Sequence, residues 1–360
     1  MGGRSSAPWA VTLSLMVRLA SAVVGLFVLA APAHANPGDL DRGFGDHGRL
    51  VVRTSAVVAG MTLVDERRPL LTVQPSKGDE SSGVSFTVAV SAAGRVLGRA
   101  PVPAPAPLAL PAGFEVRTSG VDGAGRTVVV GHASPGDDRA LRFLPDGALD
   151  TSYGTDGGVD LMALADPFAI VVKPDGRAHI FDEDSQMLLD PAGRSLLPST
   201  EPSLSWPRLN QPGGVDTVAD GPGDTVLVAG RSIDDDPFVM RIGADGRLDR
   251  GFGTRGFAHL QSAGWFIPAG ITRDQRGRLL VGGTTNARAI VVRLTSKGRF
   301  DRSFGNAGRT RIAPPRGLKG WDAHFLRLDA HDRIVVAGSG WTKDQDVGAF
   351  RPVIARLSGG

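Results

Sequence analysis

The chain has 360 residues, with 40 Lys and Arg, 37 Asp and Glu, and no cysteine. Without cysteine it cannot form disulfides, thiol-based active sites, thiolate metal sites or iron–sulfur clusters, so burial and hydrogen bonding must hold the fold together. Residues 36–360 carry 38 basic against 37 acidic side chains and no dense basic run, which argues against nucleic acid and anionic membranes as partners.

The first 35 residues have the features of a secretory signal peptide. Arg4 and Arg18 supply positive charge, an apolar run follows from Leu19 to Ala31, and Ala33-His34-Ala35 has the small-x-small form of a cleavage site. The run is shorter than the ~20 residues of a spanning helix, although a retained N-terminal anchor is the alternative interpretation. We expect cleavage after Ala35 and export as a secreted, extracellular protein with no membrane insertion.

A glycine-rich motif recurs in register along residues 36–360. Its four clear copies begin at Leu40, Leu149, Leu248 and Phe300, and each contains Asp at the second position and an aromatic-Gly pair at the end. The spacings are 109, 99 and 52 residues, and degenerate copies at 91–95 and 190–194 occupy the two long gaps. The sequence therefore contains six repeats of about 54 residues.

Each repeat contains several short segments of strand-like composition. An Asp-initiated turn precedes a β-branched run, as at 122–131, and this combination indicates a hairpin. A third apolar run follows, as at 290–294, and a fourth comes after the aromatic-Gly pair, as at 49–52. Four strands in ~50 residues are typical of a propeller blade. We predict an all-β, six-bladed β-propeller of four-stranded antiparallel blades, forming a single domain over residues 36–360.

The last repeat is divided between the two ends of this domain. It stops at 356–360, midway through a motif whose other half lies at 37–41. The last blade is therefore predicted to combine 36–53 with 314–360, so that the N-terminal strand closes the propeller and no sheet edge stays exposed. Specifically, Leu50–Arg53 should pair antiparallel with Val353–Leu357.

The motif resembles a known bacterial repeat. The signature Leu-Asp-x-Ser/Gly-Phe-Gly-x-x-Gly, preceded by an Arg-Leu strand and an Asp-Gly turn, is similar to the delta-60 repeat of secreted proteins, and the similarity extends over residues 37–360. The resemblance implies a β-propeller and export, and it assigns no biochemical activity.

An arginine of the third strand and the aspartate of the motif occur together in every clear repeat. Both are missing from the two degenerate repeats, which suggests that they touch, as an ion pair that fixes the loop between the third and fourth strands. A ring of ligand-binding residues is the alternative. The pairs are Arg142 with Asp150, Arg241 with Asp249, Arg293 with Asp301 and, across the closure, Arg356 with Asp41.

Strand direction separates the loops into two faces. The repeat motifs occupy the connections between strands one and two and between strands three and four, which share one side of an antiparallel blade. The opposite side, which we call the variable face, has connections that differ between repeats, and it is the candidate binding face. Aromatic residues precede the innermost strands there and could stack on a ligand at the channel mouth or pack between blades: Phe114, Phe168, Trp206, Trp265 and Trp321. The binding hypothesis predicts exposed tryptophans.

Acidic residues occupy the second-to-third loops of most repeats. They are Asp79 and Glu80, Asp137 and Asp138, Asp182 to Asp184, Asp234 to Asp236, and Asp344 and Asp346. Calcium is one interpretation, but the sequence lacks a calcium-loop motif, and we favour solvated loops without a metal or cofactor. No catalytic motif with defined spacing occurs, so no catalytic residue is assigned.

These observations predict a monomeric, non-catalytic secreted protein. It would bind a glycan, a peptide or a surface protein through the variable face. The alternative is an extracellular hydrolase or lyase with its active site at the channel mouth, and a cluster of His, Asp and Arg there would favour the enzyme.

Overall fold

The structure is a computed structural model that describes residues 36–75, 86–101, 108–132, 134, 137–183, 185–197, 212–232, 234–260, 266–342 and 350–360. Within these ranges the chain forms strands, turns and irregular connections, so the all-β prediction is confirmed. None of these residues belongs to a helix long and apolar enough to cross a membrane. The predicted signal peptide, residues 1–35, lies outside the described residues.

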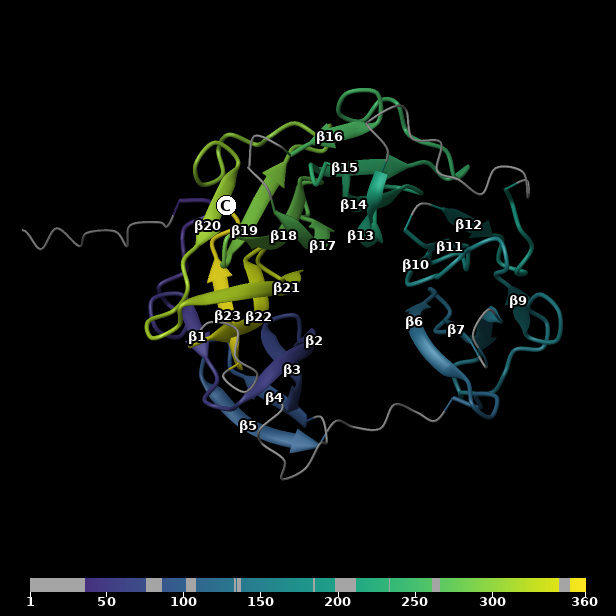
Figure 1. Ribbon diagram of the computed structural model, residues 1–360, viewed down its shortest axis with the longest axis horizontal. Coiled ribbons are helices and arrows are strands. Elements are labelled where there is room, and N and C mark those ends of the chain that lie inside the picture. The colour runs from purple at the N-terminus through teal and green to yellow at the C-terminus, as the bar shows by residue number, and fades with distance from the viewer. Residues whose placement is uncertain are drawn as a thin grey trace, which may run out of the picture. The chain divides into compact units, whose positions relative to one another are not determined.

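The strands form six antiparallel sheets, and in five of them neighbours in sequence are hydrogen-bonded neighbours in space, whereas in the sixth β1 pairs with β23 (Figure 1). Sheet I contains β2 (Ala56–Val64), β3 (Arg68–Pro75), β4 (Phe86–Val90) and β5 (Val96–Pro101), and sheet II contains β6 (Glu115–Val121), β7 (Thr127–His132), β8 (Asp138–Phe143) and β9 (Gly158–Asp160). Sheet III contains β10 (Ala169–Val172), β11 (Ala178–Phe181) and β12 (Gln186–Leu189), and sheet IV contains β13 (Pro212–Asp220), β14 (Val226–Ser232), β15 (Pro237–Ile242) and β16 (Phe257–His259). Sheet V contains β17 (Ile267–Arg273), β18 (Leu279–Thr285), β19 (Arg288–Leu294) and β20 (Arg309–Ile312). Sheet VI contains β21 (Gly320–Leu328), β22 (Ile334–Trp341), β23 (Phe350–Leu357) and β1 (Arg49–Val51). One sheet per repeat is the propeller-like pattern expected.

Sheet III departs from the predicted four strands. It has three strands among the described residues, and 198–211 lie outside them. A single bridge between Leu189 and Ser195 corresponds to the bridges from Phe143 to Leu149 and from Ile242 to Leu248 at the start of the motif in intact repeats.

Sheet VI confirms the predicted pairing of the two ends of the domain. β1 pairs antiparallel with β23, and Leu50 lies opposite Ile354 and Val51 opposite Val353 (Figure 1). One sheet therefore contains strands from both ends of residues 36–360.

The two ends also build one turn together. The Gly38 amide donates to the Ser358 carbonyl at 2.8 Å, and the Ser358 amide donates to the Asp39 carbonyl at 2.9 Å. In the uninterrupted turn of sheet I, Gly94 and Ser91 make the same two bonds, Gly94 to the Ser91 carbonyl and Ser91 to the Arg95 carbonyl. The turn of sheet VI thus has the hydrogen bonds of a repeat turn without its continuous backbone.

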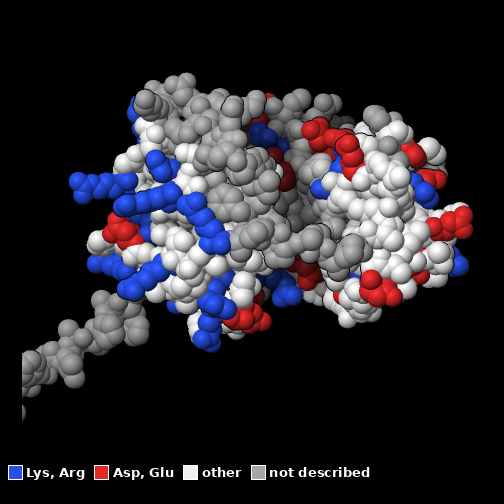
Figure 2. All heavy atoms as spheres, turned by 90° about the horizontal axis from the view of Figure 1, so that it is seen from below, with Lys and Arg blue, Asp and Glu red and all other residues white. Residues whose placement is uncertain are grey.

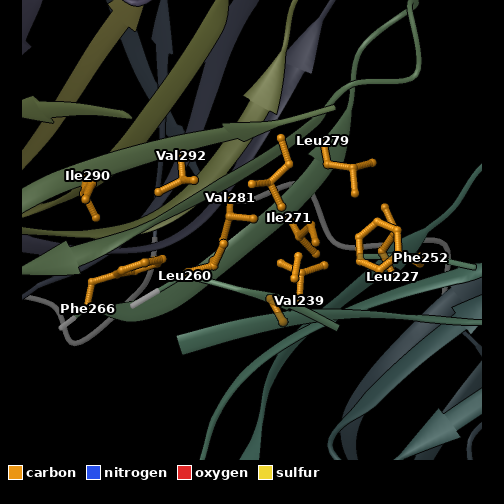
Figure 3. Packing of buried hydrophobic residues seen from close by; sticks show 13 residues of the cluster. Leu227, Val239, Phe252, Leu260, Phe266, Ile271, Leu279, Val281, Ile290 and Val292 are labelled. Carbon is orange, nitrogen blue, oxygen red and sulfur yellow. The ribbon is translucent and has the colours of Figure 1, made fainter. Parts of the chain in front are cut away.

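The hydrophobic core lies between neighbouring sheets. In β14, Val228 packs in the cluster shared by sheets III and IV, whereas Leu227 and Ala229 pack in the cluster shared by sheets IV and V. Figure 3 shows the second of these clusters, with Val239 of sheet IV near Ile271 and Val281 of sheet V. Because a middle strand is buried on both faces, its sequence is continuously apolar and does not alternate.

The predicted contact between the repeat arginine and aspartate is confirmed in all four intact repeats. Each Nε donates to the carboxylate: Arg142 to Asp150 at 2.8 Å, Arg241 to Asp249 at 2.7 Å, Arg293 to Asp301 at 2.8 Å and Arg356 to Asp41 at 2.8 Å. Each guanidinium also lies over the aromatic ring of its own motif, with 4.3 Å from Arg142 to the ring centre of Tyr153 as the shortest separation.

Each repeat arginine additionally binds the next sheet. Arg241 of sheet IV donates through Nη1 to the Ser296 carbonyl of sheet V at 3.1 Å. The amide of Gly253, in the motif of sheet IV, donates to the Lys297 carbonyl in the same turn at 2.9 Å. Equivalent bonds from Arg142, Arg293 and Arg356 reach the carbonyls of Pro191, Gly359 and Ala92. The motif therefore joins neighbouring sheets as well as ordering its own loop.

Candidate functional site

The variable face contains an irregularity that repeats from sheet to sheet. The first strand of each sheet is an edge strand, and β2, β6, β13, β17 and β21 each have a register shift near the end that meets this face. One extra residue stands at each shift: Ala59, Arg117, Asp216, Ala269 and His324. A β-bulge re-aims its side chain and often lies beside a functional site. These equivalent positions therefore define the candidate site.

In sheets II, IV, V and VI the repeat glycine near the end of the second strand explains the bulge, whereas in sheet I the bulge occurs opposite Val73. A Cβ on Gly131 would lie 2.1 Å from the Glu115 carbonyl oxygen, and one on Gly338 would lie 1.7 Å from that of Asp322. Only glycine permits such a close backbone approach. The sequence analysis treated this glycine as a strand end and missed the bulge that it allows.

The bulge of sheet II places a charged cluster on the variable face. Arg117 forms an ion pair with Asp166, which precedes β10, and its Nε lies 3.5 Å from Asp138 Oδ1. The same Nε donates to Nδ1 of His132 at 3.1 Å. Glu115 Oε2 lies 3.8 Å from Nε2 of His132. The cluster thus combines His, Asp, Glu and Arg from three strands and one connection.

Two details give this cluster chemical character. His132 accepts a hydrogen bond at Nδ1, so the neutral imidazole carries its proton on Nε2, directed toward Glu115. Asp138 is buried, and its Oδ1 receives no hydrogen bond from the described residues. An unsatisfied buried carboxylate oxygen is unfavourable, so this atom is a natural acceptor for a polar group of a ligand.

Sheet IV has a second polar cluster at the equivalent bulge. Arg231, at the end of β14, donates to Asp216 at 3.1 and 3.2 Å and to Asp235 at 2.8 Å. Burial raises the pKa of Asp216 above its ordinary value, although the hydrogen bond and positive charge of Arg231 oppose this shift.

Sheet VI has a third pair, Asp322 and His324. Burial raises the pKa of Asp322 and lowers the pKa of His324, and in each case attraction between the two groups opposes the shift. Burial therefore favours the neutral form of both side chains.

The aromatic residues proposed from the sequence do not form an exposed cluster. Trp321 is 0% exposed, and its Nε1 donates to the Ile312 carbonyl at 3.1 Å, so it lacks the exposure that the binding hypothesis predicts and agrees with the alternative of packing between sheets. It lies in β21 and packs in the core between sheets V and VI, where the neighbouring sheet covers it. Phe114 and Phe168 are partly buried against hydrophobic clusters. Trp206 and Trp265 lie outside the described residues.

The acidic loops do not provide a metal site in the described part of the chain. No group of three or more His, Cys, Asp or Glu side chains there could hold a metal ion. Asp182 accepts from the amides of Ala165 at 2.9 Å and Ser185 at 2.5 Å, which is a structural role within its loop. Asp79, Glu80, Asp184, Asp344 and Asp346 lie outside the described residues.

Comparison with known proteins supports the propeller fold. Residues 125–153 and 277–304 match a family model described as "Domain of unknown function (DUF5122) beta-propeller". No curated protein matches the sequence.

Solved structures similar to this chain have low sequence identity to it. Regucalcin from Agrobacterium tumefaciens, a calcium-binding protein, is 14% identical with a TM-score of 0.38, and the match covers 68% of this chain and 74% of that one. The GH74 xyloglucanase from Xanthomonas campestris is 14% identical with a TM-score of 0.44, over 91% of this chain and 45% of the xyloglucanase. The WD40 domain of Toxoplasma gondii coronin is 9% identical with a TM-score of 0.43, and the match covers 90% of this chain and 84% of that one.

Proposed function

We propose that the protein is exported after cleavage behind Ala35 and folds as a closed six-bladed β-propeller of the delta-60 type. The six sheets, one for each repeat, support the blade number, and the pairing of β1 with β23 supports closure through the last blade. The signal-peptide features of residues 1–35 support export.

Its function in this proposal is non-catalytic binding through the variable face. One observation carries the proposal: equivalent bulges present Arg117, Asp216 and His324, whereas the Arg–Asp pairs of the opposite side stay the same from repeat to repeat. A constant scaffold with changing polar groups at one position is the arrangement of a recognition surface. The partner would be a glycan, a peptide or a surface protein that offers hydrogen-bonding groups.

Glycan and peptide arrays test this proposal. Residues 36–360 are applied with and without calcium, beside the variants Arg117→Gln and Asp216→Asn. Arg302→Gln is the matched control because Arg302 is exposed in a repeat motif on the opposite side. We expect the two bulge variants to lose about tenfold in affinity and the control to bind as wild type. Binding that is unchanged in both bulge variants would contradict the proposal.

A hydrolase or lyase is the second candidate, and the cluster of sheet II favours it. His132, Asp138 and Arg117 bring together a neutral imidazole, a buried carboxylate and a cation on the variable face. An imidazole can act as a general base, and a cation can stabilise negative charge that develops in a reaction. This candidate predicts product release from polysaccharide or peptide substrates and about a hundredfold loss of rate in His132→Gln. Equal turnover by wild type and His132→Gln would eliminate this cluster as the active site.

A further inference from the structure

A basic groove runs along β1, the edge strand of sheet VI, and reaches the variable face. It has a volume of about 950 Å³ and lies between β1, the connection from β20 to β21, and the facing ends of β22 and β23. Four arginines line it: Arg49, Arg53, Arg316 and Arg351. The groove is lined by residues from both ends of the domain, so it depends on the pairing of β1 with β23.

Two of these arginines line the same end of the groove. Val51 lies opposite Val353 and the Val52 amide donates to the Pro352 carbonyl at 2.9 Å, and the next residues of the two segments, Arg53 and Arg351, both line the groove. Like charges that share a site repel each other. An anion between the two guanidinium groups would remove this repulsion.

The described residues of the groove offer little negative charge. Among them, Asp46 is the one acidic residue of the lining, and it contacts His47 at 2.5 Å. Within the described part of the chain, Arg53, Arg316 and Arg351 form no ion pair. Arg49 is the exception in being anchored, since its Nη1 donates to the Ala313 carbonyl at 3.2 Å.

The charge of the whole domain is also divided. Residues 36–107 and 261–360 together contain 25 basic against 14 acidic side chains, whereas residues 108–260 contain 13 basic against 23 acidic. Figure 2 shows one face of the molecule, on which most Lys and Arg lie to the left and most Asp and Glu to the right. The near-zero total thus conceals a positive region that would attract anionic polymers toward the groove.

We propose that this groove binds an anionic polysaccharide through its carboxylate or sulfate groups. The inference rests on the proposed binding function and names its ligand class. Guanidinium groups bind such anions in a bidentate manner, and Leu50, Leu318 and Pro315 provide apolar contacts for sugar rings. Among the described residues the lining contains no Phe, Tyr or Trp side chain, although single-stranded nucleic acid is normally bound by stacking on such residues.

Affinity electrophoresis of residues 36–360 tests the assignment. Gels contain polygalacturonate as the carboxylate probe, dextran sulfate as the sulfate probe, or uncharged dextran. The double variant Arg53→Gln/Arg351→Gln is compared with Arg250→Gln/Arg302→Gln, whose arginines are exposed in repeat motifs outside the groove. We expect retardation by at least one charged probe, a loss of about tenfold or more in the groove variant, and less than about twofold loss in the control.

Different results would contradict the groove assignment and the ligand class. Equal loss in both double variants, or retardation by uncharged dextran alone, overturns the groove assignment. Tighter binding to single-stranded DNA or to anionic phospholipid vesicles than to either polysaccharide overturns the ligand class. If array ligands are lost in Arg117→Gln but retained in the groove variant, the proposed binding function stands and the groove proposal is wrong. Unchanged melting temperatures confirm that the variants are folded.

Discussion

The intact repeats, those of sheets II, IV, V and VI, differ from the degenerate repeats of sheets I and III in how they contact the next sheet. In an intact repeat, one arginine binds its own aspartate and a backbone carbonyl of the following sheet, as Arg241 binds Asp249 and Ser296. A degenerate repeat has only the short turn and lacks both partners. The motif that recurs in this chain therefore connects neighbouring sheets. Where a repeat lacks the motif, either other residues make the connection or the contact between the two sheets is weaker.

The contact between sheets III and IV is compensated. Lys173 is 2% exposed on its side chain, and its Nζ donates to Asp220 at 2.5 Å and to the carbonyls of Gly223 and Thr225. Gln186 adds a bond from its Nε2 to the Gly246 carbonyl in the turn of sheet IV. Lys173, in the turn after β10, and Gln186 of β12 thus make the contact with sheet IV that the repeat arginine makes elsewhere.

The repeat of sheet I is degenerate, so no repeat arginine of sheet I contacts sheet II. Hydrophobic residues cover this side of sheet II instead. Its cluster of Val129, Leu141 and Phe143 packs against Leu108, Leu110 and Phe114, which belong to the connection before β6. In β6 itself, Val116 and Val121 are 48% and 59% exposed. The degenerate repeat of sheet I therefore precedes the least buried first strand described.

Among the changes that test this comparison, deletion of residues 36–53 should lower the free energy of unfolding most. The deletion removes β1, the Asp41 partner of Arg356 and the fully buried Phe44. Loss of one buried Phe alone costs ~3–5 kcal/mol, so we expect the shortened protein to lose more than about 5 kcal/mol and most of its cooperative unfolding. Urea unfolding followed by circular dichroism measures this, with Arg42→Ala, an exposed change in the same segment, as control. A shortened chain with an unchanged midpoint would show that sheet VI does not need β1.

A smaller effect is expected from Arg293→Met in an intact repeat. Arg293 is 1% exposed and binds Asp301 and the Gly359 carbonyl, so the change leaves Asp301 with only the more distant Arg278, at 3.8 Å, as a cation. Removing one partner of a buried ion pair costs ~3–5 kcal/mol. The double variant Arg293→Met/Asp301→Asn should recover part of this loss. The exposed Arg302→Met is the control, and an equal effect of both single variants would contradict a special role for the repeat arginine.

At the compensated contact, Lys173→Met should destabilise by about 1–3 kcal/mol. Methionine preserves the apolar stem, but the Gly223 carbonyl loses its lysine donor and the Thr225 carbonyl keeps only the Gly221 amide. The exposed Lys297→Met serves as the matched control. If both lysine variants melt at the same temperature, Lys173 does not replace the missing arginine.

The sequence predicted those features that are repeated within one period. The strand pattern, the contact of Arg142 with Asp150 and the pairing of β1 with β23 all follow from spacing along the chain or from the split motif. The bond from Arg142 to Pro191 joins residues 49 positions apart in different repeats, and spacing within one repeat contains no information about it.

The candidate site was less accessible to sequence reasoning. A glycine such as Gly131 has the same sequence pattern whether it only ends a strand or also permits a bulge in the neighbouring strand. The sequence therefore could not distinguish Arg117 from an ordinary residue of an edge strand. Its contact with Asp166 depends on the packing of sheets II and III. The burial of Trp321 could not be predicted for a related reason, because periodicity shows that an aromatic stands at the start of a strand and does not show which neighbour covers it.

The smallest effect on stability is expected from changes in the hairpin turn between the first and second strands, which leave the contact between sheets intact. Unlike the Arg–Asp pair, a turn that contains an aspartate survives in a degenerate repeat, although in sheet III Lys173 opens the turn in the place of Asp122 and Asp175 lies within it. Asp122 of sheet II accepts from the amides of Ala124 and Arg126, and Asp175 of sheet III accepts from the Arg177 amide at 3.0 Å. Burial opposes ionisation of both carboxyls, but the hydrogen bonds and the neighbouring arginine outweigh it and lower the pKa of each.

A lowered folded-state pKa means that each carboxylate stabilises the fold above its unfolded pKa, near 3.8, and that this contribution disappears as the pH falls through the lower folded value. At pH 7 we expect Asp122→Asn to cost about 1–2 kcal/mol, and Asp175→Asn to cost less than about 1 kcal/mol because its side chain is 49% exposed. Urea unfolding between pH 7 and pH 2 should show each variant approaching wild type only at the acidic end. A difference that stays constant down to pH 2 would mean that geometry, and not the charge of the carboxylate, holds the hairpin in intact and degenerate repeats alike.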